Sequence, residues 1–414
     1  MAPPDTPELT TQCCIAGGGP AGLMLGYLLA RAGVRVLVLE KHADFLRDFR
    51  GDTIHPSTLT VLQDLGLLEQ FLQLPHQRVT ELRGDVYGEQ VTLADFSHLP
   101  PPGNFLVLIP QWDFLDFIAG QGRRYPGFEL RMGAQAVGIV EENGAVAGMR
   151  VEEGGRQFVV RCDLVVGADG RHTTIRGSAG LQPEDVGAPI DVLWFRLPRD
   201  AARDPSRTGG TLRPGAMLVT LNRDSYWQCA YVIPKGSLDR IQQQGIEAFR
   251  RKVAHVAGFL GDSVHVLESW DQVKLLEVQI NRLPRWYRQG LLCIGDAAHA
   301  MSPVGGVGIN LAIQDAVAAS NLLAAPLRER RLTMDDLAAV QRRRDWPTRV
   351  TQRAQVAVQN EMLSPVLART GAPARVPLPV TLLQRLPLLQ RLPARLVGIG
   401  VRPERVRTAP ADLA

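Results

Sequence analysis

Residues 13–40 read CCIAGGGPAGLMLGYLLARAGVRVLVLE, and this stretch decides the fold. Its first four residues are apolar and predict a short strand, which runs directly into the glycine-rich turn GGGPAG. Residues 21–32 then predict a helix, and residues 34–39 predict a second buried strand that ends at Glu40. A strand, a glycine turn, a helix and a second strand in this order are typical of a dinucleotide-binding βαβ unit.

The glycines of this turn follow the spacing G-x-G-x-x-G, and each has a physical reason. Gly17 permits the tight turn from strand to helix, Gly19 lets a pyrophosphate approach the backbone, and Gly22 lets helix and strand pack closely. Pro20 and Ala21 begin the helix, whose unpaired N–H groups and positive dipole end favour phosphate. These five residues therefore form a predicted phosphate site.

The acid at the end of the second strand completes the pattern. Glu40 follows Gly22 by eighteen residues, and its carboxylate can accept hydrogen bonds from the adenosine ribose while it disfavours a 2′-phosphate. Lys41 comes directly after it and is included in the predicted cofactor site. A glycine turn alone can serve packing only, but the complete unit predicts dinucleotide binding.

The composition is that of an ordinary globular protein. The 414 residues are enough for two or three domains, and 45% of them are hydrophobic. A net charge of +4 gives no reason to expect a nucleic-acid partner. The N-terminus has neither a basic region nor an apolar region of a signal peptide, and no uncharged apolar run reaches about eighteen residues.

The five cysteines do not form a disulfide framework in a chain of this length. Most of them lie in apolar runs, which suits reduced thiols in a core and a cytoplasmic location. Cys13 and Cys14 are adjacent in a strand and point to opposite faces, so they are poorly placed for a metal. No metal site is predicted.

Two further motifs stand at junctions between a strand and a turn. Residues 163–176 read DLVVGADGRHTTIR, and residues 291–310 read LLCIGDAAHAMSPVGGVGIN. The second motif leads into a helix over residues 310–324, which carries only Asp315 as a charge and is therefore expected to be buried. The three glycines before this helix predict a nest of backbone donors for an anionic group.

The three motifs, in this order, closely resemble those of the para-hydroxybenzoate-hydroxylase-like (group A) FAD-dependent monooxygenases, which include ubiquinone-biosynthesis and phenol-type hydroxylases. The resemblance runs from about Gln12 to Leu323, and Thr173 replaces the usual serine while keeping its hydroxyl. It implies an α/β fold with a discontinuous, Rossmann-like GR2-type FAD-binding domain, an inserted α+β substrate domain and a C-terminal helical segment. The expected bounds are 1–76, 103–185 and 285–325 for the FAD-binding domain, 77–102 and 186–284 for the substrate domain, and 326–414 for the C-terminal segment.

The resemblance implies a role for individual residues. Gly17, Gly19, Gly22 and Glu40 would hold the ADP half of a non-covalent FAD. Arg50 and Gln111 resemble family residues on the flavin side, with Gln111 at the end of a strand expected over residues 106–111. Asp296 would bond the ribityl hydroxyls. Gly308, Ile309 and Asn310 would lie beside the flavin pyrimidine edge, where a helix N-terminus stabilises the negative charge of the reduced flavin.

Other positions leave alternatives open. Pro303 matches the family proline near the reactive face of the flavin, and His299 is a candidate base by motif position, with a structural role in its turn as the alternative. Asp169 and Arg176 resemble residues implicated in FAD and NAD(P)H binding, with bracing as the alternative. The aromatic side chains Trp194, Tyr226 and Tyr231 line either a sheet core or a substrate, and an amphipathic helix is expected to follow them around residues 238–260.

The implied activity is a monooxygenase that uses NADH or NADPH and O2 and hydroxylates an aromatic or quinone-like small molecule through a flavin C4a-hydroperoxide. One alternative is an FAD-dependent reductase or dehydrogenase of the same fold with an isoprenoid-type substrate. A flavin halogenase is a second alternative, but residues 229–234 read CAYVIP and lack both tryptophans of the halogenase motif W-x-W-x-I-P.

The C-terminal tail has an unusual composition. Residues 366–414 hold eight arginines and only two acids, interleaved with leucine and proline. This composition indicates either a helical cap over the first domain or a basic, apolar surface for peripheral contact with a membrane or partner. A lipophilic quinone-type substrate would suit such a surface, and the chain is expected to be a monomer or homodimer.

Overall fold

The computed structural model describes residues 7–46, 53–205, 208–368 and 376–411, so Arg50 lies outside the described residues. A six-stranded sheet forms its first layer, in the order β21-β22-β13-β2-β3-β9. All neighbouring pairs are parallel except β21 and β22. The strands are β2 (Cys13–Ala16), β3 (Val36–Glu40), β9 (Phe128–Met132), β13 (Leu164–Gly167), β21 (Tyr287–Arg288) and β22 (Leu291–Cys293).

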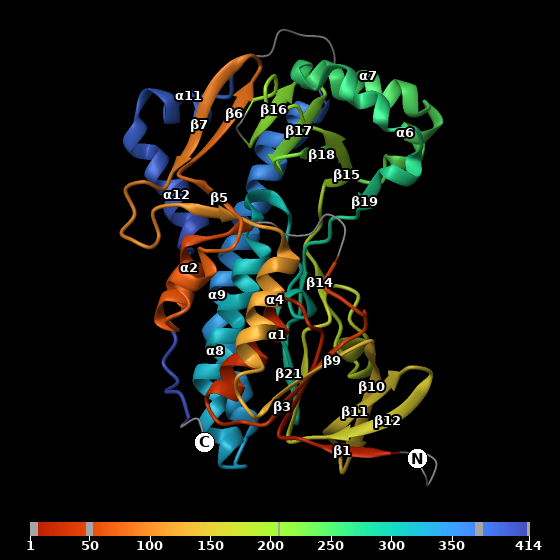
Figure 1. Cartoon of the computed structure of the whole chain (residues 1–414), viewed down its shortest axis with the longest axis vertical. Coiled ribbons are helices and arrows are strands. Elements are labelled where there is room, and N and C mark those ends of the chain that lie inside the picture. The colour runs from red at the N-terminus through yellow and green to blue at the C-terminus, as the bar shows by residue number, and fades with distance from the viewer. Residues whose placement is uncertain (1–6, 47–52, 206–207, 369–375, 412–414) are drawn as a thin grey trace.

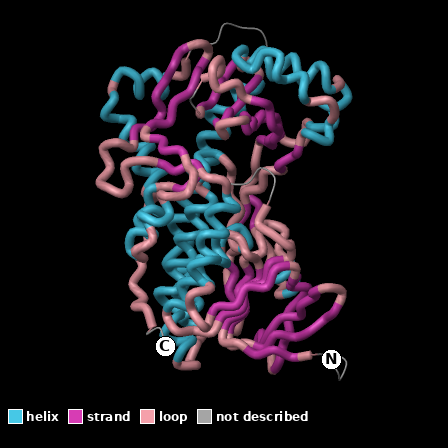
Figure 2. Tube along the Cα trace, viewed as in Figure 1, coloured by secondary structure: helices cyan, strands magenta, loops and turns pink. Residues whose placement is uncertain are grey.

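Helices cover one face of this sheet, and a small mixed sheet, antiparallel except for the β1–β12 pair, covers the other (Figures 1 and 2). Helix α1 packs against α4 and α8, and α8 packs against α9. The helices of this layer are α1 (Pro20–Arg31), α4 (Gln111–Gly122), α8 (Gly308–Arg328) and α9 (Met334–Val358). The opposite layer consists of β1 (Glu8–Thr10), β10 (Ala134–Glu142), β11 (Ala145–Glu153) and β12 (Arg156–Arg161).

Helix α8 is the buried helix that the sequence predicts. Asp315 near its middle has no exposed surface. Among the described residues one segment, Val304–Arg328, is long and apolar enough to cross a membrane, and 83% of its apolar window is buried inside the protein. Free, mostly buried cysteines also agree with the sequence, since Cys13, Cys14, Cys229 and Cys293 are all buried.

A second, seven-stranded sheet combines two distant parts of the chain, in the order β19-β15-β18-β17-β16-β6-β7. Its strands are β6 (Glu81–Val86), β7 (Glu89–Asp95), β15 (Ile190–Pro198), β16 (Gly209–Arg213), β17 (Ala216–Asn222), β18 (Tyr226–Pro234) and β19 (Lys274–Leu276). The seam is the parallel pair β6–β16, where Gly84 lies opposite Gly210. A Cβ on Gly84 would lie 3.0 Å from the Gly210 carbonyl oxygen, so the seam needs a glycine there.

One face of this second sheet is covered by helices. The sequence predicts a single helix around residues 238–260, whereas the structure has α6 (Leu238–Gln243), α7 (Ile246–Val256) and a 3-10 helix at Gly258–Val266. The break falls at Gly245, whose φ of 83° lies in the left-handed region that ends a helix. Phe249 of α7 packs edge-on against Phe195 and Tyr231 of the sheet.

Short elements complete the fold. They are β4 (Thr53–Ile54), β5 (Gln77–Val79), β8 (Leu106–Leu108), β14 (Glu184–Asp185), β20 (Asn281–Arg282), α2 (Pro56–Asp64), α3 (Leu68–Phe71), α5 (Thr174–Ser178), α10 (Ser364–Ala368), α11 (Leu378–Arg385) and α12 (Arg391–Gly398). Helices α11 and α12 pack beside β7 at one edge of the protein (Figure 1). The remaining C-terminal residues then run back along the first domain, where Ala411 N–H donates to the Arg31 carbonyl.

Candidate functional site: a dinucleotide cradle at the sheet edge

The three motifs meet at one edge of the parallel sheet, because each follows a strand that ends there. Backbone hydrogen bonds join them directly. Gly17 N–H donates to the Leu39 carbonyl at 2.8 Å, Ala168 N–H to that of Ala16 at 2.8 Å, and Ile294 N–H to that of Gly167 at 3.0 Å. The predicted convergence of the motifs is thus a property of the fold.

The glycines of the first turn have the space that their predicted roles require. A Cβ on Gly17, whose φ is +103°, would lie 2.4 Å from the Ala168 carbonyl oxygen, and one on Gly22 would lie 1.9 Å from that of Gly17. A Cβ on Gly19, in contrast, would meet none of the described residues within 4 Å. Gly19 caps α1 without a side-chain hydrogen bond and Pro20 has no N–H, so in the described part of the chain no capping side chain occupies the free N–H groups that follow in the first turn. The cradle fits a pyrophosphate.

Glu40 closes this cradle on the side of β3. One of its carboxylate oxygens accepts from Gly18 N–H at 3.0 Å, and the other accepts from His42 N–H at 3.1 Å. The residue is 8% exposed. Lys41, which follows, is exposed.

The second motif braces the other two. One carboxylate oxygen of Asp169 accepts from Thr174 N–H at 2.8 Å and from Ile175 N–H at 3.2 Å, at the start of α5. Burial raises the pKa of Asp169, although hydrogen bonds from Thr173 and the backbone oppose that rise. Arg176 donates to the Ala297 carbonyl at 3.1 Å, which links this motif to the third one.

Asp296 occupies the turn of the third motif, and its side chain is 34% exposed. The Arg171 guanidinium lies 3.7 Å from its carboxylate. The neighbouring Gly295 lies against helices α1 and α8, because a Cβ there would be 3.2 Å from the Ala21 Cβ and 3.3 Å from the Ala312 Cβ. Asp296 therefore directly follows the point at which the third motif contacts the start of α1.

His299 belongs to a buried charge network. Its Nε2 atom lies 2.5 Å from Asp315, whose other carboxylate oxygen accepts from Arg344 Nε at 3.0 Å. Arg344 also bonds Glu404 of the C-terminal segment at 3.3 Å. Burial by itself would raise the pKa of Asp315, but His299 and Arg344 outweigh burial and hold that pKa below its usual range. His299 is 1% exposed, an environment that favours its structural role in the turn.

The N-terminus of α8 is fixed by Asn310. Its side-chain oxygen accepts from His55 N–H at 2.9 Å and Thr58 Oγ at 2.6 Å, and its amide donates to the Thr53 carbonyl at 3.1 Å. This leaves the backbone of Gly308 and Ile309 at the helix start, and both residues are half-buried. Pro303, also half-buried, begins the turn that leads to them.

Sequence reasoning missed His55, which lies directly behind the glycines before α8. Its Nδ1 atom is 2.7 Å from the Val397 carbonyl of α12, and the described residues offer its buried Nε2 atom no hydrogen-bond partner. Burial lowers the pKa of His55 to about 4, against the raising effect of the Val397 bond. The only signal in the sequence is its place before Pro56 at the start of a helix.

The three aromatic candidates for substrate contact lie in different environments. Tyr231 points to the α7 side of the second sheet, is 6% exposed and packs against Phe249 with ring centroids 5.4 Å apart. Burial raises its pKa to about 12. Trp194 packs on the other face with Ala230 and Val219, while Tyr226 stacks under Arg196 at 5.1 Å. Of the two alternatives that the sequence leaves open for these residues, sheet core or substrate contact, Tyr231 occupies the sheet core.

Gln111 is the first residue of α4, not the last of a strand, because β8 ends at Leu108 and Pro110 caps the helix. Its half-buried side chain therefore projects from a helix N-terminus. The described residues contain no group of three or more histidine, cysteine or acidic side chains that could hold a metal.

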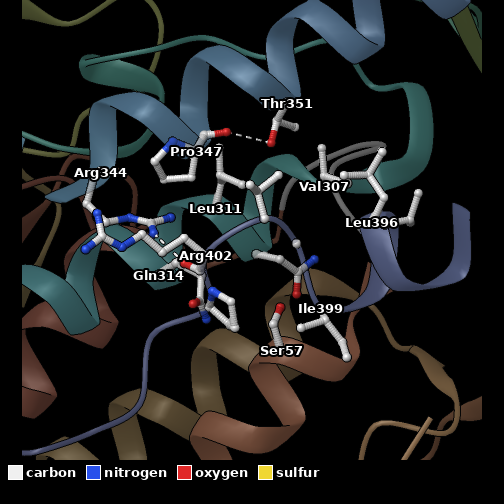
Figure 3. A pocket seen from close by; sticks show the side chains of 15 residues that line it. Ser57, Val307, Leu311, Gln314, Arg344, Pro347, Thr351, Leu396, Ile399 and Arg402 are labelled. Atoms are coloured by element: carbon white, nitrogen blue, oxygen red, sulfur yellow. Dashed lines mark hydrogen bonds between the residues drawn. The ribbon is translucent and has the colours of Figure 1, made fainter. Parts of the chain in front are cut away.

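A small cavity lies behind α8, between α2, α9 and the C-terminal segment (Figure 3). Its volume is about 20 Å³, which suits a single water molecule. Ser57, Gln314, Arg344 and Arg402 line its polar side. This volume is far too small for an aromatic substrate.

The comparisons with known proteins agree with this geometry. The family model described as FAD binding domain matches residues 10–354, so the chain belongs to the FAD-dependent monooxygenases of this family. It is 35% identical to "6-methylpretetramide 4-monooxygenase" of Streptomyces rimosus over 402 residues, 96% of this chain and 94% of that relative. It is 28% identical to "Rifampicin monooxygenase" of Streptomyces venezuelae, covering 73% of this chain and 61% of that relative.

Solved structures share the fold. The anhydrotetracycline hydroxylase OxyS of Streptomyces rimosus aligns with a TM-score of 0.74 at 24% identity, covering 94% of this chain and 76% of that one. Together with the family match, these likenesses confirm the predicted α/β fold, the class of FAD-dependent monooxygenase, and FAD, O2 and NAD(P)H as its cofactor and co-substrates.

Proposed function

We propose that this protein introduces one oxygen atom into an aromatic small molecule. The substrate would belong to the same class as 6-methylpretetramide, the compound in the name of its 35% identical relative. The observation that carries the proposal is the 35% identity over 96% of this chain and 94% of that monooxygenase. The other relatives with aromatic or tetracycline-like substrates match about three quarters of this chain and roughly 60% of their own length. The C-terminal segment of this chain therefore corresponds to that of the full-length relative.

We assign the cradle to the ADP half of FAD. The N–H groups at Gly19 and the start of α1 would receive the pyrophosphate, and Glu40 would face the ribose. The backbone at Gly308 and Ile309 would stabilise negative charge on the flavin, while Asp296 would meet its ribityl chain. Bound FAD supplies the activation of O2, and the residues of this chain bind it, orient it and exclude water.

The substrate would lie between the Pro303 turn and the second sheet. Val304 packs with Ile190, Val232 and Leu363, and the adjoining part of the same sheet face carries Trp194. This face is apolar and opposite the one that α7 covers, so it offers a dry wall for an aromatic ring system. We therefore divide the chain into the FAD-binding and substrate domains predicted from the sequence, with Trp194 as the first aromatic contact to test.

The decisive experiment uses the purified protein with FAD, NADH or NADPH, and 6-methylpretetramide under 18O2. The proposal expects faster NAD(P)H oxidation in the presence of this compound and a product heavier by one 18O atom. A product without 18O, or electron transfer to the compound under nitrogen, would instead indicate the reductase alternative. A brominated or chlorinated product in the presence of halide would indicate the halogenase alternative.

We propose that the protein is cytoplasmic and makes peripheral contact with an anionic membrane through α11 and α12. Six leucines of this region are between 43% and 70% exposed. They are Leu378, Leu382, Leu386, Leu388, Leu392 and Leu396. Residues 376–403 contain four arginines, all exposed, and no acid, so a complementary surface must be both apolar and negatively charged.

Vesicle sedimentation tests this contact. The protein should bind vesicles that contain phosphatidylglycerol but not vesicles of phosphatidylcholine alone. The double variant Leu392→Ser, Leu396→Ser should no longer bind the anionic vesicles, and the molar mass of the particle in solution should be unchanged. Light scattering after size-exclusion chromatography distinguishes a monomer from a homodimer. Unchanged vesicle binding by the double variant, or a dimer that this variant converts to a monomer, would overturn the membrane assignment.

A further inference from the structure

Helix α9 and the π-helical turn that follows it at Gln359–Leu363 present glutamines on one face. Gln352, Gln355 and Gln359 are separated by three and four residues, so they lie above one another on the helix surface. Their exposed fractions are 0%, 5% and 0%. Burying a primary amide is costly unless it is hydrogen-bonded, so such a row needs partners.

Most of their partners lie in one loop, residues 300–304, and Gln352 also donates to the Asn281 carbonyl of β20 at 2.8 Å. Gln352 donates to the Ala300 carbonyl at 3.0 Å. Gln355 donates to the carbonyls of Ser302 at 2.9 Å and Val304 at 2.8 Å, and its oxygen accepts from Ser302 N–H at 3.3 Å. One amide therefore holds the carbonyls on both sides of Pro303.

The row extends into the π-helical turn. Gln359 donates to the Ser302 hydroxyl at 2.5 Å, and that hydroxyl also accepts from Val304 N–H at 3.2 Å. The same turn places Leu363 against Val304 and the second sheet. A π-helical turn shifts the register of a helix, and such turns are often found at functional sites.

We propose that Gln355, assisted by Gln359, is a positioning residue for the monooxygenase reaction. It sets the position of the Pro303 turn between the cofactor and the substrate face, because among the described residues no backbone N–H from another element bonds the carbonyls of Ser302 and Val304. The inference rests on the proposed function and on the match of Pro303 to the family proline near the reactive face of the flavin. Loosening the turn would admit water and misalign the substrate, so that NAD(P)H oxidation would continue without oxygen transfer.

The chain offers a matched control on the same helix. Gln341 donates to the Pro284 carbonyl at 2.8 Å, and its oxygen accepts from Trp286 N–H at 3.0 Å. It clamps a backbone segment in the same manner as Gln355, but that segment leads into β21 and does not carry Pro303. The variants Gln355→Met and Gln341→Met each keep a side chain of similar length and remove the clamp.

Two readouts separate positioning from stability. The first is amide hydrogen exchange of the peptide covering residues 300–308 in the FAD-free protein, which should accelerate roughly tenfold in Gln355→Met and remain unchanged in Gln341→Met. The second is coupling, the product formed per NAD(P)H oxidised with 6-methylpretetramide as substrate. We expect coupling to fall at least threefold in Gln355→Met with a matching rise in H2O2, while Gln341→Met retains the wild-type ratio.

The inference is overturned if exchange of residues 300–308 is unchanged in Gln355→Met, or if the two variants lose coupling equally. Should Gln355→Met not fold, Gln355→Glu takes its place, because it keeps the acceptor for Ser302 N–H and removes both donors. A wild-type enzyme that forms no oxygenated product contradicts the proposed function, and the exchange experiment then still decides whether Gln355 holds the turn.

Discussion

Lowering the pH from 7.5 to 5.0 should destabilise this protein specifically through His55. The imidazole is fully buried, and its Nδ1–H donates to the Val397 carbonyl, which can only accept. Protonation would place a second N–H on Nε2, for which the described residues provide no acceptor. Gly306 lies beside that atom, because a Cβ on Gly306 would be in ordinary van der Waals contact with it at 3.6 Å.

The sign and the size of this change in stability follow from the lowered pKa of His55. The pKa of His55 falls from 6.5 to about 4 in the folded protein, so between these values the unfolded chain binds more protons. Stability conferred by the neutral ring is complete above pH 6.5 and is lost as the pH falls toward 4. From the two pKa values, the loss between pH 7.5 and pH 5.0 is about 2 kcal/mol.

Urea unfolding of wild type and His55→Asn at both pH values isolates this contribution. Asparagine can still donate an N–H toward Val397 but does not titrate. The variant should be less stable at pH 7.5, and its deficit should shrink by about 2 kcal/mol at pH 5.0. Equal losses for both proteins between the two pH values would show that His55 is not held neutral by burial, and the reasoning would be wrong.

Further predictions concern the charge network and the cradle. Asp315→Asn should lower the free energy of unfolding by about 3–5 kcal/mol, because buried Arg344 keeps Glu404 but loses the charge of Asp315. Asp345→Asn, at the half-exposed pair with Arg349, should cost less than about 1 kcal/mol by the same urea assay. Gly19→Val should fold but raise the FAD dissociation constant at least tenfold in a fluorescence titration, while Gly22→Ala should lower the melting temperature even without FAD, because its Cβ would lie 1.9 Å from a carbonyl oxygen. Normal FAD affinity of Gly19→Val would contradict the cradle.

Local patterns predict the cradle well because its geometry is local. The helix expected at residues 21–32 is α1, Pro20–Arg31, and the buried helix with a single charge is α8. The spacing of the glycines reflects the steric requirements of a single turn, so the turn can be predicted from one sequence. The meeting of the three motifs follows equally from the rule that parallel strands end at the same edge.

Contacts between distant segments could not be read in this way. Gln355 looks like a surface residue of a polar helix, and only the approach of the 302–304 backbone gives its amide a role. Alternation in β18 cannot say whether Tyr231 faces α7 or the opposite side of the sheet, because apolar residues pack on both sides. The helix predicted over residues 238–260 ends early because Gly245 adopts a left-handed conformation that apolar periodicity does not reveal.

The seam between β6 and β16 affects how the chain folds while it is being synthesised. Strand β6 pairs with β16, whose residues 209–213 are synthesised more than 120 residues later. A nascent chain of about 200 residues therefore exposes the unpaired edge of β6 in the β6–β7 hairpin. The parallel sheet likewise lacks β22 until residue 293 is synthesised. Open strand edges invite pairing with other chains. Fragments that end between residues 103 and 208 should therefore aggregate. A soluble part of this enzyme is more readily obtained by joining residues 77–102 to residues 186–284 than by truncating the chain at a single position.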